Sequence, residues 1–185
     1  MYSILKIARK LNWKFLNDLP EDYQIEHLLL DSRQVIFPAK SLFFAIKGKR
    51  QDGHDFIENI YNSGVRNFIV SRKIETQSYP NANFIFVKNV ITALQEIASF
   101  HRHQFDLKTI GVTGSNGKTI VKEWLFQLLR EDFKIIRSPK SYNSQIGVPL
   151  SVWQIRKDHE LGIFEAGISM PGEMEKSAPV LDCEI

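Results

Sequence analysis

The chain alternates between short apolar runs and stretches whose apolar residues recur at helical spacing. Short runs rich in β-branched and aromatic residues are typical of buried strands, and apolar residues spaced three and four apart are typical of helices. We expect strands at 28–30, 41–46, 65–70, 83–87, 109–113, 133–137 and 161–164. We expect helices at 3–12, 52–62, 90–102, 118–129 and 149–155, with a further helix opening at 170–175. This alternation predicts an α/β protein.

Two units are expected along the chain. The segment Phe105–Lys108 follows the last helix of the first unit and is the expected junction, so the predicted domains are 1–106 and 107–185. In the second unit each strand is followed by a helix before the next strand, which predicts a mostly parallel sheet.

Composition excludes several classes of protein. The 24 basic and 21 acidic residues give a net charge of +3, too balanced to indicate a nucleic-acid or membrane-surface partner. Cys183 is the single cysteine, which excludes an internal disulfide framework and suits a reducing compartment. The N-terminus lacks the apolar segment of a signal peptide, and no stretch is long enough to cross a membrane. A cytoplasmic protein is therefore expected.

The most informative stretch runs from Thr109 to Thr119. A β-branched run to Thr113 predicts a strand, Gly114-Ser115-Asn116-Gly117 breaks it, and Lys118 opens a helix. A strand, a glycine-containing loop and a helix together form the arrangement that binds a polyphosphate such as that of ATP. The N–H groups of the loop and helix point at the anion, Lys118 adds a positive charge, and the Thr119 hydroxyl is a candidate Mg²⁺ ligand.

This loop departs from the common phosphate-loop pattern in one position. That pattern has a glycine five positions before the Gly117-Lys118 pair, where this chain has Val112. The alternative is a glycine turn that precedes an amphipathic helix and binds nothing. The strand before the loop and the helix after it favour nucleotide binding.

A second candidate residue is Glu165, which ends the apolar run Leu161–Phe164. Nucleotide enzymes place a Mg²⁺ ligand at the carboxyl end of a parallel strand beside the phosphate loop. The alternative is a strand-end glutamate that faces solvent. The neighbouring apolar run and Gly167 favour the metal ligand. Lys118 and Glu165 are therefore the candidate catalytic residues.

Several ordered motifs share a resemblance to one protein family. In chain order they are Asp31-Ser32-Arg33, Leu42–Gly48, Asp52–Phe56, Thr113–Thr119 followed by Val121-Lys122-Glu123, Asn143 in Asn-x-x-Ile-Gly-Val-Pro, and Glu165-x-Gly167. Together they resemble the Mur ligases, the amide-forming enzymes of peptidoglycan precursor synthesis, over most of the chain. The resemblance implies an N-terminal substrate domain followed by the first part of a P-loop-type ATP-binding domain.

In this family the N-terminal domain holds the UDP end of the substrate. The resemblance therefore implies Ser32, Arg33 and Gly48 as substrate-binding residues, because side chains at a strand end can meet uracil or diphosphate oxygens and a glycine lets the backbone approach. The alternative is that Asp31 pairs with Arg33 and the segment only forms a turn. Asn143 is implied to line the cleft between phosphate loop and substrate, and its alternative role is that of a turn former.

The resemblance implies an ATP- and Mg²⁺-dependent ligase that joins D-alanyl-D-alanine to a UDP-N-acetylmuramoyl tripeptide through an acyl phosphate. The nearer alternative is the family member that adds the third amino acid to a UDP-muramoyl dipeptide. The other is a nucleotide-binding module without ligase chemistry. Because the family's central domain continues beyond its Glu-x-Gly strand and a third domain follows, we expect this chain to belong to a longer ligase and to be inactive alone. Neither a nucleic-acid partner nor membrane insertion is expected.

Overall fold

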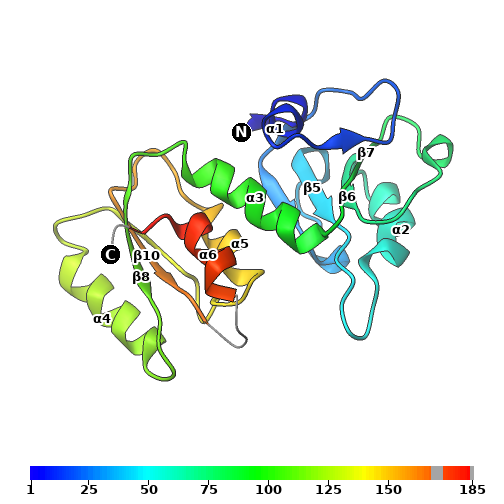
Figure 1. Cartoon of the computed structure of the whole chain (residues 1–185). Coiled ribbons are helices and arrows are strands. Elements are labelled where there is room, and N and C mark those ends of the chain that lie inside the picture. The colour runs from blue at the N-terminus through cyan, green and yellow to red at the C-terminus, as the bar shows by residue number, and fades with distance from the viewer. Residues whose placement is uncertain (168–172, 184–185) are drawn as a thin grey trace. The chain divides into compact units, whose positions relative to one another are not determined.

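The computed structural model describes residues 1–167 and 173–183, and the chain divides into two compact units, Met1–Ala93 and Leu94–Ile185. The division falls inside helix α3 (Val90–Arg102), upstream of the junction expected at 106 and 107. Both units combine helices with parallel strands, which confirms the predicted α/β class (Figure 1). Within the described residues, no helix is both long enough and apolar enough to span a bilayer.

The first unit is built on one mixed sheet. Its strands and helices are β1 Tyr2–Ser3, α1 Ile4–Lys10, β2 Lys14–Phe15, β3 Gln24–Ile25, β4 His27–Leu29, β5 Ser41–Phe44, α2 Ile57–Asn62, β6 Asn67–Val70 and β7 Asn83–Phe86. The sheet order is β2-β7-β6-β5-β4, with β4 to β7 parallel and β2 antiparallel at the edge. β1 and β3 form a separate antiparallel pair. The two-residue strands β1, β2 and β3 are too short for the hydrophobic pattern to predict.

The core of the first unit is a row of phenylalanines on the central strands. All residues of β5 and β6 are buried, as expected for central parallel strands whose two faces are both covered. The Phe68 ring stacks on Phe84 with the centroids 4.9 Å apart, and its edge meets Phe43 at 6.1 Å. The aromatic rings therefore tie three adjacent strands together.

The entry to α2 is fixed by a buried histidine. Asp52 caps the 3-10 turn Gly53–Phe56 by accepting from the backbone N–H of His54, which confirms the predicted helix start. The Nε2 atom of His54 accepts from the N–H of Ser71 at 3.0 Å, so Nδ1 carries the proton and donates to Asp52 at 2.5 Å. Burial alone would raise the pKa of Asp52, but the hydrogen bonds from His54 outweigh it and lower that pKa. His54 therefore joins the start of α2 to the end of β6.

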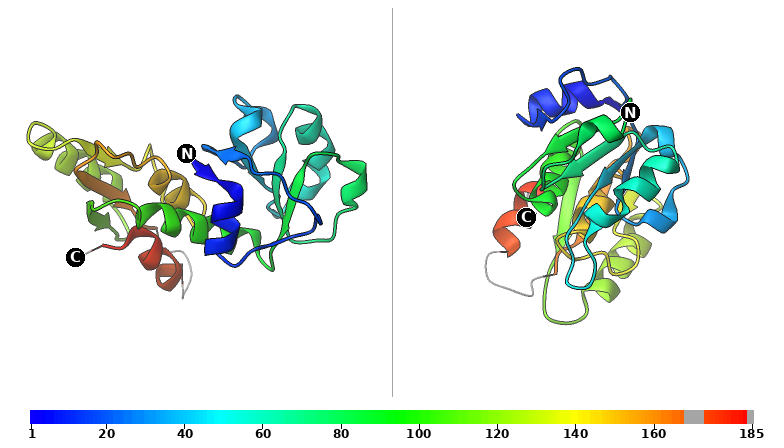
Figure 2. Two further views of the ribbon diagram at one scale, coloured as in Figure 1. Left: turned by 90° about the horizontal axis from the view of Figure 1, so that it is seen from above. Right: turned by 90° about the vertical axis from the view of Figure 1, so that its right-hand side faces the viewer.

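The second unit is a three-stranded parallel sheet with helices on both faces. Besides α3, its elements are β8 Lys108–Val112, α4 Lys118–Leu129, β9 Ile135–Arg137, α5 Gly147–Val152, β10 Leu161–Glu165 and α6 Glu173–Leu181. The strand order is β8-β10-β9, so the strand that comes last in sequence lies in the middle. Figure 1 shows α4 on one side of β8 and β10, with α5 and α6 on the other, and Figure 2 gives further views.

Side-chain alternation along β10 separates the two faces of this sheet. Leu161 and Ile163 point to the α4 side, where they meet Leu125 and Leu129. Phe164, one residue out of phase, packs with the residues of α5 and α6 on the opposite side. The next residue on the α4 side is Glu165 (see below), so the period of the strand determines which helix the glutamate faces.

The α4 helix is present as predicted, but only part of its apolar stripe, which includes Ile120, Trp124, Leu125, Leu128 and Leu129, faces the sheet. Ile120, Trp124 and Leu128 are 57%, 63% and 74% exposed. Leu125 and Leu129 of this stripe face the sheet, and they are joined there by Phe126 and by Lys122, which is completely buried. Hydrophobic spacing alone therefore identified the helix and two residues of its buried side, but not the buried lysine.

Replacing Phe68 with alanine is expected to lower the free energy of unfolding of the first unit by about 3–5 kcal/mol, because a fully buried ring leaves a cavity. Phe86→Ala is the matched control, since this phenylalanine ends the neighbouring strand β7 and is 39% exposed. Denaturant unfolding followed by circular dichroism measures both. Equal losses in the two variants would show that the aromatic row is not the core.

Candidate nucleotide site

The loop between β8 and α4 has a backbone that only glycine adopts readily at two positions. Gly114 has φ of 144° and Gly117 has φ of 78°, and both values disfavour any residue with a Cβ. The five residues Thr113–Gly117 are exposed, and Gly117 is the N-cap of α4. A helix start has N–H groups without intrahelical partners, so this exposed end is suited to an anion. The predicted loop residues Gly114, Ser115, Asn116 and Gly117 thus lie together at one open helix end.

Lys118 folds back over this loop. Its Nζ donates to the carbonyl oxygen of Gly114 at 2.6 Å, and the contact is exposed to solvent. The ammonium is thereby held above the loop backbone. A single hydrogen bond to a carbonyl is readily exchanged for a stronger one to a phosphate oxygen.

Thr119 and Glu165 meet although 46 residues separate them in sequence. The Thr119 hydroxyl donates to Glu165 Oε2 at 3.2 Å, and the Glu165 side chain is fully buried. The backbone N–H of Glu165 donates to Ser138 Oγ at 3.1 Å, and this hydrogen bond also fixes the end of the strand. The alternative of a solvent-facing glutamate is therefore wrong.

Lys122 is the residue of this site that sequence reasoning missed. Its Nζ lies 3.0 Å from Glu165 Oε1 and donates to the carbonyls of Ser138 at 2.8 Å and Lys140 at 2.7 Å. A second ion pair joins it to Glu123, which also pairs with Arg137. The sequence pointed to Lys122 only through its place in the family motif Val121-Lys122-Glu123.

One oxygen of Glu165 has a charge partner without a hydrogen bond. Lys122 is within ion-pair distance of Oε1, yet its two hydrogen bonds go to the carbonyls, so Oε1 is buried without a hydrogen-bond donor. The other oxygen, Oε2, lies beside the Thr119 hydroxyl, and together these two oxygens are a suitable donor set for Mg²⁺, which prefers hard oxygen ligands. In the described part of the chain no cluster of three or more His, Cys, Asp or Glu residues could hold a metal. Mg²⁺ at this point would therefore need phosphate or water oxygens to complete its ligands.

Asn143 lies beside the end of β10. Its carbonyl accepts from the N–H of Gly167 at 2.7 Å, and a Cβ at Gly167 would approach that carbonyl to 2.9 Å. In the same segment, the Ser141 hydroxyl is 3.5 Å from that of Thr119. The segment 138–143 thus borders the site from one side, with Asn143 half-buried.

The remaining predicted residues belong to the first unit. Ser32 and Arg33 follow β4, Gly48 follows β5, and these adjacent parallel strands end at the same edge of the sheet. The Arg33 guanidinium makes a two-pronged ion pair with Asp31, at 2.9 and 2.7 Å, and its hydrogen bonds lower the pKa of Asp31 to about 2. The Asp31–Arg33 pair considered as the alternative is thus present, and Arg33 is exposed.

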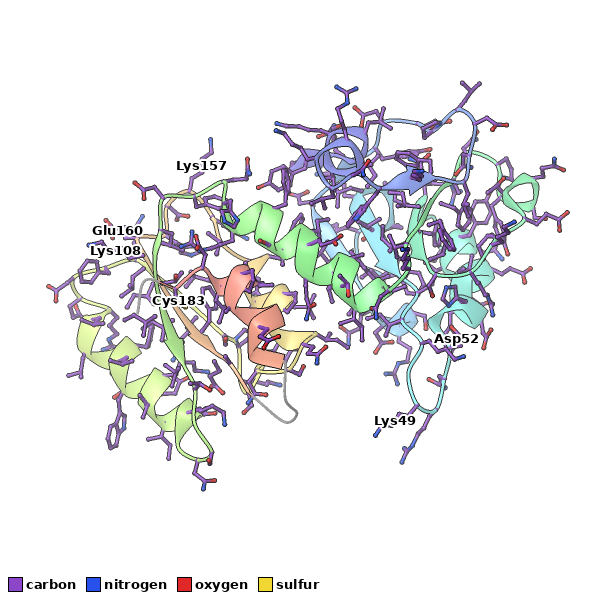
Figure 3. The ribbon with its side chains drawn as sticks, viewed as in Figure 1. Lys49, Asp52, Lys108, Lys157, Glu160 and Cys183 are labelled. Carbon is purple, nitrogen blue, oxygen red and sulfur yellow. The ribbon has the colours of Figure 1, made fainter. Side chains whose placement is uncertain are left out.

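Gly48 begins a tight turn that carries positive charge. Its N–H donates to the carbonyl of Gln51 at 2.9 Å, and the backbones of Lys47 and Asp52 form an antiparallel β-bridge at the base of the turn. Lys49 and Arg50 at the tip are exposed. The turn projects from the first unit, with Lys49 farther out than Asp52 (Figure 3).

Comparison with known proteins agrees with this geometry. Residues 24–102 match the description "Mur ligase family, catalytic domain", and residues 112–185 match "Mur ligase middle domain". The UDP-N-acetylmuramoyl-tripeptide–D-alanyl-D-alanine ligase of Borreliella burgdorferi is 38% identical over 84% of this chain and 35% of its own length. The Bacillus subtilis enzyme of the same name is 30% identical over 94% of this chain and 37% of its own. The chain thus spans about a third of the length of these relatives.

Solved structures give the same result. The corresponding ligase from Acinetobacter baumannii superposes with a TM-score of 0.88 at 26% identity, over 98% of this chain and 40% of that one. The MurF ligase of Thermotoga maritima in complex with ADP gives a TM-score of 0.75 at 31% identity, over 84% and 35%. Both family descriptions, matched in order along one chain, lead to one conclusion. The chain belongs to the Mur ligase family.

Proposed function

We propose that this chain supplies the nucleotide site and the UDP-substrate site of an ATP-dependent ligase that adds D-alanyl-D-alanine to a UDP-N-acetylmuramoyl tripeptide. The observation that carries the proposal is the contact between Thr119 of the glycine loop helix and the buried Glu165. The relatives named for this reaction, together with the one crystallised with ADP, support it. Because the proposed reaction uses ATP and a UDP-linked substrate, we propose that it takes place in the cytoplasm.

In the proposed reaction, a carboxylate of the tripeptide attacks the γ-phosphorus of ATP, and ADP leaves. The amine of D-alanyl-D-alanine then attacks the acyl phosphate, and phosphate leaves as the amide forms. Phosphoryl transfer requires mainly positioning and neutralisation of charge. The loop N–H groups and Lys118 would bind the phosphates, and Asn143 would border the substrate. Thr119 and Glu165 would hold Mg²⁺, which neutralises charge on the transferred phosphoryl group when it is bound.

The first unit would bind the UDP end of the substrate. Lys47, Lys49 and Arg50 surround Gly48 on one projecting turn, and exposed cations on such a turn suit a diphosphate. Ser32 and Arg33 follow the neighbouring strand at the same edge. Uridine contacts from those residues and diphosphate contacts from the turn would divide the recognition between two strand ends.

The direct test of the proposal is calorimetry on the whole chain with ATP and with the UDP-muramoyl tripeptide. We expect both ligands to bind, independently of one another. If neither ligand binds the folded chain, the proposal is refuted.

Lys118→Ala is expected to weaken ATP binding about 10- to 100-fold, the loss that corresponds to one charge-assisted hydrogen bond to a phosphate. Alanine suits a helix start, so the fold should persist. Lys157→Ala is the control, because this exposed lysine precedes β10 at the end opposite Glu165. Undiminished ATP affinity in Lys118→Ala would show that the loop is not the phosphate site.

Glu165→Gln is expected to abolish most of the advantage that Mg²⁺ gives to ATP binding, since it removes the charge and keeps the shape. The quantity to measure is the ratio of ATP dissociation constants with EDTA and with Mg²⁺. We expect that ratio to fall about tenfold, a value typical of a lost metal ligand or its support. Glu160→Gln, at the other end of β10, should leave it unchanged. If both variants give the same ratio of dissociation constants, Glu165 is not a ligand of the metal.

Reversing the charge of both Lys49 and Arg50 to glutamate is expected to weaken binding of the UDP-muramoyl tripeptide about 100-fold or more, since two attractive contacts become repulsive. Binding of ATP should not change. Reversing Arg9 and Lys10 on α1 to glutamate is the matched control, because it makes the same change in net charge at two exposed residues of the same unit. Retained substrate affinity in the double variant would rule out the turn as the diphosphate site.

A further inference from the structure

Lys122 has no role in the proposed function, although it lies beside the proposed metal site. It lies one turn after the phosphate loop on α4, and its side chain has no exposure to solvent. A buried lysine is uncommon, because desolvating an ammonium is costly unless it is paired and hydrogen-bonded. The groups that surround the Lys122 ammonium therefore indicate the role of its charge.

The Lys122 ammonium is held on three sides. The carbonyl oxygens of Ser138 and Lys140 accept from it at 2.8 and 2.7 Å, and both belong to the segment that borders the site. The third neighbour is Glu165 Oε1, at 3.0 Å. Lys140 has φ of 50°, in the left-handed region that residues other than glycine seldom adopt.

The two oxygens of Glu165 consequently have different surroundings. Oε1 faces the Lys122 ammonium, and Oε2 faces the Thr119 hydroxyl at 3.2 Å. The buried carboxylate cannot turn without leaving Lys122 uncompensated in the interior. Only Oε2 is thus directed to the side of the site that carries the phosphate loop.

We infer that Lys122 is a positioning residue that makes Glu165 a one-oxygen ligand and thereby selects Mg²⁺ over Ca²⁺. The inference rests on the proposed function, in which Glu165 helps to hold the metal. Mg²⁺ requires near-octahedral geometry with few carboxylates, whereas Ca²⁺ accepts six to eight oxygens and often takes both oxygens of one carboxylate. A carboxylate with one oxygen held by an ammonium suits the first ion and not the second.

The charge of Lys122 cannot by itself produce this preference. Its repulsion acts on either divalent ion, and both ions carry the same charge. The ratio of the two metal affinities therefore reports the geometry of the carboxylate, while each affinity alone also reports charge and stability.

The experiment measures ATP affinity of the whole chain by calorimetry, once with Mg²⁺ and once with Ca²⁺. The result is expressed as the ratio of the two dissociation constants. In Lys122→Met, which keeps the aliphatic stem, we expect this ratio to shift about tenfold towards Ca²⁺. An unchanged ratio in the variant would overturn the inference, even if the variant is less stable.

Arg102→Met is the matched control. Arg102 is also a buried cation of the second unit with carbonyl partners, those of Phe105, Leu107 and Leu181, and it does not contact Glu165. It should lower the unfolding temperature and leave the metal ratio as in the parent. If the unchanged chain binds ATP with neither metal, the proposed function fails and the inference with it, a result distinct from an unchanged ratio.

A second measurement needs no substitution, in case Lys122→Met does not fold. In the ¹⁵N-labelled parent chain, the buried ammonium of Lys122 should give a slowly exchanging NMR signal. We expect this signal to persist after Mg²⁺ and ATP are added, because Lys122 keeps its hold on Oε1. Rapid exchange of the ammonium in the Mg²⁺-ATP state would contradict the inference.

Discussion

The second unit depends on one buried ion pair, between Lys122 on α4 and Glu165 at the end of β10. Both side chains are fully buried, and removing either partner of such a pair typically costs about 3–5 kcal/mol, because the other charge is left in the interior. The pair also brings together a helix, a strand end and, through two carbonyls, the segment after β9. The residues proposed to hold Mg²⁺ therefore have positions set by an interaction that stabilises the fold.

The alternation of side chains along β10 places Glu165 on the face of the sheet that Lys122 covers. Leu161, Ile163 and Glu165 share the face covered by α4, while Phe164 serves the core on the other side. A shift of one residue in the register with β8 would turn the glutamate towards α5 and α6. The apolar residues that fix the register are thus also responsible for the geometry of the polar site.

The sequence was informative where local chemistry decides the outcome. The glycine loop and the strand that ends in Glu165 were predictable, because positive φ values and a buried apolar run leave signals in single segments. The orientation of α4 was only partly predictable, since Trp124 and Leu128 of its apolar stripe are exposed and Lys122 is buried. That arrangement depends on a carboxylate more than forty residues away, which no local pattern encodes. The short strands β1 to β3 were not predicted for a related reason, because their pairing depends on tertiary contacts.

The central claim is that the glycine loop, Thr119 and Glu165 form one nucleotide and metal site. A crystal structure of the chain with ADP and Mg²⁺ tests it most directly. The account predicts phosphates at the N-terminus of α4, Lys118 moved from the Gly114 carbonyl to a phosphate oxygen, and the metal in contact with Thr119 and Glu165 Oε2. Nucleotide bound elsewhere on the chain, or a metal ion that contacts neither Thr119 nor Glu165, would contradict the account.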